Sequence, residues 1–463
     1  MRPPSVDAVL RAANSSLNGH ERAAVTELAR DVVADERAAL AGGAEGRSTD
    51  ALASELIARL ANLASADDAV EGSGLVPVIN ATGVILHTNL GRAAWPAAAI
   101  EAARLAASTA SLLELDADTG RRGRRFRAVE DEVVALTGAE DALVTNNNAA
   151  AVALAVGLAG RDGVAVSRGE LVEIGGGVRI PEIVRRAGAR LVEVGTTNRT
   201  RVPDFEAALA DGRAKVVLRV HPSNFSQSGF VEAPDAAELA RVAHERGAIV
   251  IDDLGSGALL DTERFGLAHE PTPRERLEAG ADLVTFSGDK LVGGPQAGII
   301  AGRAELVAKL RKDPLARAMR PDKVILAALA ATLRVYRAGL AEQEIPIWRQ
   351  IAAPADGIEA RAQRLATALV QAGGAGVSID VVAVESTIGG GSLPGQTIDS
   401  RAVRIAGASP ERLLAALRSA RPAVVGRILD DAVVFDLRTV EPSDDERLGS
   451  AIRQALASTS TRS

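Results

Sequence analysis

Short apolar runs recur between about position 75 and position 330, separated by stretches whose apolar residues have helical spacing. Runs of this length that are apolar on both faces, alternating with helices, indicate a mostly parallel sheet buried under helices. Ligands of such a sheet bind beyond the carboxyl ends of its strands. The pattern predicts seven strands, at ALVT (142–145), VAVS (164–167), RLVEV (190–194), KVVLRV (215–220), AIVID (248–252), DLVTF (282–286) and AGIIA (297–301).

The segments on either side of this alternation have other patterns. Residues 1–65 have helical apolar spacing and predict a small helical unit, and residues 66–80 read as a polar, glycine-bearing linker. The alternating region, 81–335, predicts a large domain. Residues 336–463 begin with a helical stretch and continue as strand, helix, strand, strand and helix, which predicts a small α+β domain. A chain of 463 residues exceeds what one core usually supports, which agrees with this division.

Composition excludes several classes of site. The chain has no cysteine, which excludes disulfides, thiolate metal sites and a cysteine nucleophile. Its five histidines lack metal-ligand spacing, so we expect no catalytic metal. The N-terminus lacks a signal-peptide pattern and no stretch approaches about twenty apolar residues, which predicts a cytoplasmic protein without a membrane partner. The net charge is −7, so we expect no DNA partner, and an RNA partner would need a local basic surface.

One lysine is a candidate for covalent chemistry. Lys290 lies in SGDKLVGGPQAG, directly after a predicted strand, and only five of the 53 basic residues are lysine. A Schiff base needs a primary amine that can lose its proton, which arginine cannot provide. The competing interpretation is an exposed loop lysine, but Ser287 and the glycine-rich turn bring hydroxyl and backbone donors to the same place. The pattern therefore favours an imine between Lys290 and pyridoxal 5′-phosphate (PLP).

Two further strand ends carry side chains that suit this cofactor. Asp252 ends AIVID, where a carboxylate can pair with a protonated pyridine nitrogen. Asp253 competes for this role, and a turn or helix-capping aspartate is the structural alternative. HPSNF follows KVVLRV, so His221 or Asn224 can contact the cofactor ring, although a buried histidine with satisfied hydrogen bonds is nearly as common.

A polar turn leads from a predicted strand into an alanine-rich helix in TNNNAAAVALAVGLA (145–159). The unpaired N–H groups and positive dipole end of a helix bind phosphate, which points to Asn147, Asn148 and Ala149 in the first turn. A capped helix without a ligand would have the same sequence. Because an aspartate and a lysine follow at later strand ends, the turn predicts the phosphate site of the cofactor.

Several sequence motifs, in their order along the chain, resemble those of the bacterial selenocysteine synthase family, also called L-seryl-tRNA(Sec) selenium transferase. The resemblance covers most of the chain. It implies a fold-type I PLP enzyme with an aspartate aminotransferase-like large domain. The motifs are NATGVILHTNLGRA (80–93), TGRRGRRF (119–126), NNNAAAV (146–152), SRGELVEIGG (167–176), VEVGTTNRT (192–200), HPSNF (221–225), DLGSGAL (253–259) and SGDKLVGGPQAG (287–298).

The resemblance also implies a reaction and its residues. Lys290 matches the family's Schiff-base lysine, and Asp289 matches an acidic residue that assists proton transfer. Arg92, Arg317 and Arg320 match arginines that hold the phosphate of selenophosphate, which suits a small polyanion because guanidinium groups bind such oxygens in bidentate fashion. Seryl-tRNA(Sec) would lose water on PLP to give a dehydroalanyl-tRNA, and selenium would then add to its Cβ. Family members form homo-oligomers, either dimers or rings of dimers, with active sites between subunits.

Two features leave alternatives open. The run 121–127 contains five arginines, which could contact RNA phosphates or a neighbouring subunit, or could be exposed to solvent. The N-terminal unit, where the family recognises tRNA, is not visibly basic. One rival hypothesis is a related PLP lyase acting on a small phosphorylated amino acid or amino-sugar acid; another is a tRNA-binding protein without catalysis. The presence of the N-terminal unit favours a tRNA substrate, and the complete cofactor motifs favour an enzyme.

Overall fold

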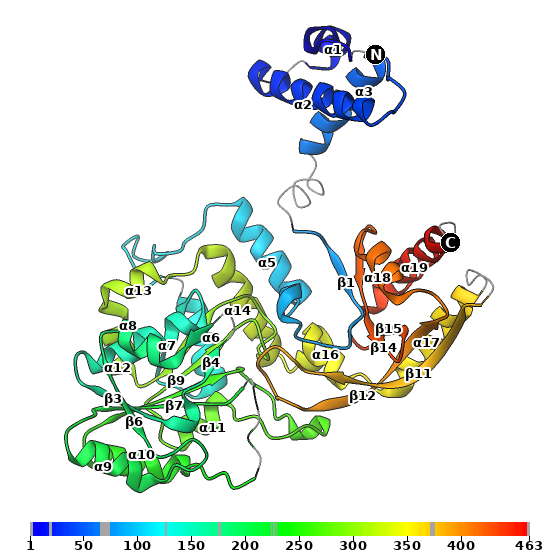
Figure 1. Cartoon of the computed structure of the whole chain (residues 1–463). Helices are drawn as coiled ribbons and strands as arrows, with labels where there is room; N and C mark the ends of the chain where they lie inside the picture. The colour runs from blue at the N-terminus through cyan, green and yellow to red at the C-terminus, as the bar shows by residue number, and fades with distance from the viewer. Residues whose placement is uncertain are drawn as a thin grey trace. The chain divides into compact units, whose positions relative to one another are not determined.

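A computed structural model describes residues 3–17, 21–64, 75–125, 127–174, 177–223, 225, 227, 229–370 and 376–460 (Figure 1). The chain forms two compact units. The first comprises Met1–Val78 with Ser419–Ala423, and the second comprises Ile79–Arg418 with Val424–Ser463. Residues 66–74, which are most of the predicted linker 66–80, lie outside the described residues, as does Asn224.

The described residues of the first unit form three α-helices, α1 (Val6–Ala13), α2 (Arg22–Ala41) and α3 (Thr49–Ala64). Their apolar faces pack on one another around a small core that includes Val9, Val32 and Leu56. Ser5 caps α1, because its side chain accepts a hydrogen bond from the amide of Ala8. Helical structure is thus present where the sequence predicts it.

The second unit is built on a seven-stranded sheet, and each of the seven predicted runs overlaps one of its strands. Six strands run parallel, and β10 at position two is antiparallel to both neighbours. This confirms the mostly parallel sheet. The order is β2 (Asp141–Thr145), β10 (Gly298–Gly302), β9 (Leu283–Ser287), β8 (Ile249–Gly255), β7 (Val216–Val220), β3 (Gly163–Ser167) and β6 (Arg190–Val194).

Helices cover both faces of this sheet (Figure 1). Along β7, Val216, Leu218 and Val220 belong to one hydrophobic core, whereas Val217 belongs to another. This alternation follows from the pleat of a strand, whose successive side chains point to opposite faces. The helices of this part are α5 (Ala97–Ser108), α6 (Arg127–Thr137), α7 (Asn148–Val156), α8 (Ile180–Arg186), α9 (Val202–Ala210), α10 (Ala236–Glu245), α11 (Pro273–Glu278), α12 (Ala304–Lys312), α13 (Pro314–Ala318) and α14 (Lys323–Arg337).

The C-terminal part carries a four-stranded antiparallel sheet in the order β11, β12, β15, β14. The predicted strands and helices are found here, and α18 begins at Pro410 as the preceding serine indicates. Strand β11 was not predicted. The bounds are α15 (Ala341–Glu344), α16 (Pro346–Ala352), α17 (Ala355–Val370), β11 (Ser378–Thr387), β12 (Thr397–Ala406), α18 (Pro410–Arg418), β13 (Ala423–Val425), β14 (Arg427–Leu429), β15 (Ala432–Asp436) and α19 (Asp445–Ser460), and the short strands β1 (Val78–Asn80), β4 (Glu173–Ile174) and β5 (Val178–Arg179) lie earlier.

Among the described residues, no helix combines the length and the apolar character that crossing a bilayer requires.

Candidate active site at the carboxyl ends of the strands

A cavity of about 310 Å³ lies where β7, β8 and β9 end and α7 begins. Eight of the residues predicted from sequence line it. These are Arg92, Asn147, Asn148, Ala149, His221, Ser287, Asp289 and Lys290. The fold therefore brings together side chains that are nearly 200 positions apart in sequence, at the place where open parallel sheets bind their ligands.

Lys290 is the central amine of this cavity. It is 6% exposed, and its Nζ lies 3.4 Å from the carbonyl oxygen of Gly391. Burial lowers the pKa of Lys290, and the positive charge of Arg92 lowers this pKa further. A lowered pKa makes the uncharged amine available at lower pH than in an ordinary lysine, and an uncharged amine can attack an aldehyde or accept a proton.

The carboxylate facing Lys290 is that of Asp253. Its Oδ1 accepts hydrogen bonds from Asn148 Nδ2 at 2.7 Å and from Thr285 Oγ1 at 2.9 Å. Asp253 is 3% exposed, and burial raises the pKa of its carboxyl. Two hydrogen bonds thus hold one carboxylate on the floor of the cavity.

Asp252, the first choice for this role, does not line the cavity of Lys290. It lines a separate cavity of about 290 Å³ with Arg219 and Arg276, and its Oδ2 lies 3.6 Å from Arg276 Nε. The physical reason is the pleat of β8, which turns consecutive side chains to opposite faces. Asp253, which the sequence left as the competitor, therefore lines the Lys290 cavity in place of Asp252, and which of the two carboxylates pairs with the cofactor stays a prediction.

Arg92 and Asp289 form an ion pair at the edge of the cavity. Arg92 Nη1 lies 2.7 Å from Asp289 Oδ2, and the amide of Ala93 donates to the carbonyl oxygen of Asp289 at 3.3 Å. Arg92 has a φ of 64° in the left-handed region, which is uncommon for a residue other than glycine. Such strain costs roughly 1–3 kcal/mol and persists where the surroundings demand it, often at functional sites.

The first turn of α7 supplies anion-binding groups. Asn147 caps the helix by accepting a hydrogen bond from the amide of Ala150 at 2.9 Å. The amides at Asn148 and Ala149 and the helix dipole then face the cavity. Asn148 Oδ1 is buried without a hydrogen-bond partner in the described chain. An amine, a buried carboxylate, a helix N-terminus and an unpaired amide oxygen together fit PLP.

His221 lines the same cavity and has a neighbour that sequence reasoning missed. Its Nε2 lies 3.3 Å from Oε1 of Glu270, which is 2% exposed. A single glutamate in a loop has no motif around it, so no sequence signal marked it. The contact orients the imidazole at the wall of the cavity.

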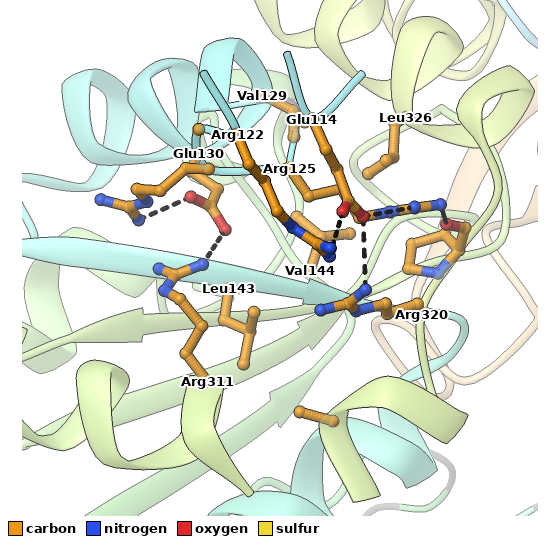
Figure 2. A pocket seen from close by; sticks show the side chains of 14 residues that line it. Glu114, Arg122, Arg125, Val129, Glu130, Leu143, Val144, Arg311, Arg320 and Leu326 are labelled. Atoms are coloured by element: carbon orange, nitrogen blue, oxygen red, sulfur yellow. Dashed lines mark hydrogen bonds and ion pairs between the residues drawn. The ribbon is translucent and has the colours of Figure 1, made fainter. Parts of the chain in front are cut away.

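Two predicted arginines lie elsewhere. Arg320 lines a second cavity of about 240 Å³, where Figure 2 shows it pointing to Glu114. Arg317 lies on α13 and is exposed. Within one chain, neither residue lines the cavity of Lys290, so the three predicted selenophosphate ligands are not assembled by a single subunit.

Comparisons with known proteins point to one family. The family model described as SelA, L-seryl-tRNA selenium transferase, matches residues 78–441. A protein of Hyphomonas neptunium named L-seryl-tRNA(Sec) selenium transferase is 50% identical over 387 residues, which are 82% of this chain and 82% of that protein. A protein of Rhizobium meliloti with the same name is 45% identical over 444 residues, which are 94% of this chain and 93% of that protein.

A solved structure confirms the fold class. The structure of D-glucosaminate-6-phosphate ammonia-lyase superposes with a TM-score of 0.59 at 23% identity and covers 86% of this chain and 100% of that chain. The α/β architecture with its mostly parallel sheet is therefore that of the fold-type I PLP enzymes predicted from the motifs. Because the family model matches well over half of the sequence, the chain belongs to the L-seryl-tRNA selenium transferase family.

Proposed function

We propose that this protein converts seryl-tRNA(Sec) to selenocysteinyl-tRNA(Sec), with selenophosphate as the selenium donor and PLP bound at Lys290. The observation that carries the proposal is the buried amine of Lys290, with its lowered pKa, beside Asp253 and the first turn of α7. The names of the relatives in Hyphomonas neptunium and Rhizobium meliloti support the substrate.

PLP, when bound, acts as an electron sink that stabilises negative charge at the Cα of the substrate's serine. In the proposed arrangement Lys290 holds the aldehyde carbon and the first turn of α7 holds the phosphate. Asp253 pairs with the pyridine nitrogen and keeps it protonated, and His221 lies against the ring. Ser287, which is 5% exposed and lines the cavity, is a further hydroxyl donor to the cofactor.

Lys290 is also the proposed base. Once the α-amine of the seryl group has taken the place of Lys290 on the aldehyde carbon, the freed amine of Lys290 would take the proton from Cα, and the resulting ammonium would return a proton to the leaving hydroxide. Asp289 directly precedes Lys290 in SGDK and is held by Arg92, so its carboxylate is the proposed group that assists this transfer. The buried setting excludes bulk water from the reacting carbon.

The selenium donor requires a second subunit in this proposal. Arg92 lines the cavity of Lys290, whereas Arg317 and Arg320 do not. We therefore propose a homo-oligomer, a dimer or a ring of dimers, in which Arg317 and Arg320 of one subunit face the Lys290 cavity of its neighbour. The helical N-terminal unit, residues 1–65, is the proposed recognition element for tRNA(Sec).

The proposal is tested with purified full-length protein and PLP. We expect a visible cofactor absorbance that Lys290→Ala and Lys290→Met lack, selective binding of tRNA(Sec) over tRNA(Ser), and formation of selenocysteinyl-tRNA(Sec) with selenophosphate. Thermal unfolding verifies that each variant folds. Cofactor absorbance without tRNA binding would indicate a lyase of small substrates, and tRNA binding without cofactor absorbance would indicate a binding protein. Either result contradicts the proposal.

Subunit mixing tests the shared active site. Lys290→Ala and the double variant Arg317→Ala/Arg320→Ala should each be inactive alone. Random mixing of the two gives half mixed dimers, each with one intact site, and thus recovery of about a quarter of wild-type activity. No recovery in mixed oligomers, shown to form by a tag on one variant, would mean that all three residues act within one subunit.

A further inference from the structure

A glycine-rich turn of the C-terminal part contacts the amine of Lys290. It follows strand β11 and comprises residues 389–392, and we call it the glycine turn. The carbonyl oxygen of Gly391 lies 3.4 Å from Lys290 Nζ, although 101 positions separate the two residues in the sequence. The amide of Leu86 donates to the carbonyl oxygen of Ile388 at 2.8 Å, which fastens the start of the turn to the segment before Arg92.

The conformation of the glycine turn requires glycine. Gly389, Gly390 and Gly391 have φ values of 74°, 54° and 77°, in the left-handed region that other residues adopt only at a cost. A Cβ added to Gly390 would lie 2.5 Å from the carbonyl oxygen of Leu86. Because these three residues have no side chains, what the turn presents next to Lys290 is its backbone.

The glycine turn carries hydrogen-bond donors that have no acceptor. Among the described residues, none accepts a hydrogen bond from the amides of Gly389, Gly390 and Gly391, which are half-buried. Ser392 is 1% exposed, and its Oγ is likewise without a partner in the described part of the chain. Buried polar groups are nearly always paired, so a buried hydroxyl without a partner at this place points to a ligand.

The charges of the Lys290 cavity indicate what kind of ligand is missing. Among the described residues of one chain, three basic side chains line this cavity, those of Arg92, His221 and Lys290. Arg92 is paired with Asp289 at 2.7 Å, and His221 lies 3.3 Å from Glu270. Lys290 is the proposed reactive amine. No cation of the cavity is therefore left for the α-carboxylate of a free amino acid, which needs such a partner when it is buried.

We infer that the glycine turn binds the ester carbonyl oxygen of the seryl group, through its backbone amides and the hydroxyl of Ser392. The serine of an aminoacyl-tRNA is esterified, so this oxygen is uncharged and is recognised by neutral donors without a cation. When Cα loses its proton, part of the negative charge passes to the same oxygen, where donors already in place stabilise it.

This inference deepens the proposed function and rests on it. It assigns the selection of an esterified serine to the glycine turn, separately from recognition of the tRNA body by the N-terminal unit. A free carboxylate could accept the same hydrogen bonds, but it would bring a full charge into a site without a free cation. Free serine should therefore be a poor substrate.

The test mixes PLP-loaded, full-length protein with seryl-tRNA(Sec), without selenophosphate, and follows the cofactor absorbance. We expect Ser392→Ala to slow the change tenfold or more, since removing one donor to a developing oxyanion slows a reaction by roughly 10²–10³. Gly390→Ala should slow it similarly, because its Cβ would displace the turn from Leu86. The affinity for uncharged tRNA(Sec) should stay within twofold of wild type in both variants, because the turn contacts only the esterified group.

The matched control is Gly395→Ala. Gly395 follows the turn closely and has a φ of 75°, but the space around its Cβ is open, so the change strains the backbone without a clash. Its rate should stay within threefold of wild type, and thermal unfolding verifies that each variant folds. A second assay compares small substrates: L-serine methyl ester should change the absorbance of the wild-type protein at least tenfold faster than L-serine at equal concentration.

Three results would overturn the inference. Wild-type rates in Ser392→Ala and Gly390→Ala would show that the turn does not bind the substrate. Equal slowing by Gly395→Ala would reduce the effect to backbone strain. Equal responses to L-serine and its methyl ester, zero included, would remove the preference for an uncharged carbonyl group. Failure of the proposed function is seen separately, as a wild-type protein whose cofactor absorbance does not respond to seryl-tRNA(Sec).

Discussion

The replacement of Asp253 by asparagine tests which carboxylate supports the cofactor. Asparagine keeps the size of the side chain and an oxygen acceptor for Asn148 or Thr285, which donate to Asp253 at 2.7 and 2.9 Å. It removes only the charge that would pair with the pyridine nitrogen. Because Asp253 is 3% exposed, water cannot replace that charge.

The magnitude follows from the burial. Leaving one member of a buried ion pair without its partner costs about 3–5 kcal/mol. If the transition state loses that much stabilisation, turnover falls by roughly two to four powers of ten, because about 1.36 kcal/mol corresponds to a tenfold change in rate. Asp252→Asn is the matched control, since Asp252 lies in the neighbouring cavity beside Arg276. We expect its turnover to stay within about tenfold of wild type.

The fold itself should tolerate the change. Burial raises the pKa of Asp253 in the folded state, so this carboxyl contributes stability at low pH that is lost as pH rises through the raised pKa. The apo form of Asp253→Asn has no ionisable carboxyl at this position, so it does not lose stability in this way. At neutral pH its unfolding temperature should equal or exceed that of the wild-type apo-protein. The assays are turnover of seryl-tRNA(Sec) and thermal unfolding of the apo-protein. Turnover of Asp253→Asn within tenfold of wild type, with a larger loss in Asp252→Asn, would refute the reasoning.

Three further variants probe the surroundings of the site. Arg92→Ala should shift the pH at which apo-protein reacts with PLP to higher values, because Arg92 and burial lower the pKa of Lys290; an unchanged or lower midpoint, followed by absorbance, contradicts this. Tyr336→Phe should lower the free energy of unfolding by about 1–3 kcal/mol in urea titrations, since the hydroxyl donates at 2.9 Å to two buried carbonyl groups just after Lys290. An unchanged urea midpoint of unfolding would argue against this role of the hydroxyl. Gly298→Ala should weaken PLP binding, because the added Cβ would lie 2.1 Å from the carbonyl oxygen of Asn147 and would displace the start of α7. Gly212→Ala is the control: the space around its Cβ is open but its φ is 66°, so this change should lower stability and leave PLP affinity unchanged.

Much of the fold could be predicted because its signals are local. Buried strands leave continuous apolar runs, and all seven strands of the central sheet fall on such runs. Strand β11 was missed: its residues alternate between partly buried and exposed, the alternation is interrupted at Val381 and Val382, and only Ser386 is buried. A strand that buries so little of its surface leaves only a weak strand signal in the sequence.

The candidate site was predictable residue by residue only in part. Eight predicted residues line one cavity, and all of them except Arg92 lie at the end of a strand or in the first turn of a helix at the same edge of the sheet. Glu270 and Glu114 were missed, since a lone acid in a loop has no motif. Glu114 contacts Arg320, which is 206 positions away in the sequence, so this contact forms only when the chain folds.

By itself, the sequence indicated the layered α/β architecture, the family and a candidate Schiff-base lysine at position 290, because apolar period and motif spacing are properties of neighbouring residues. Tertiary structure decided that Asp253, and not Asp252, faces Lys290, since the phase of a pleated strand depends on which helices cover each face. It also decided that Arg320 joins the arginine run around Glu114 in one cavity and not Lys290. Such contacts between distant segments follow from packing of the whole chain, which no local pattern encodes.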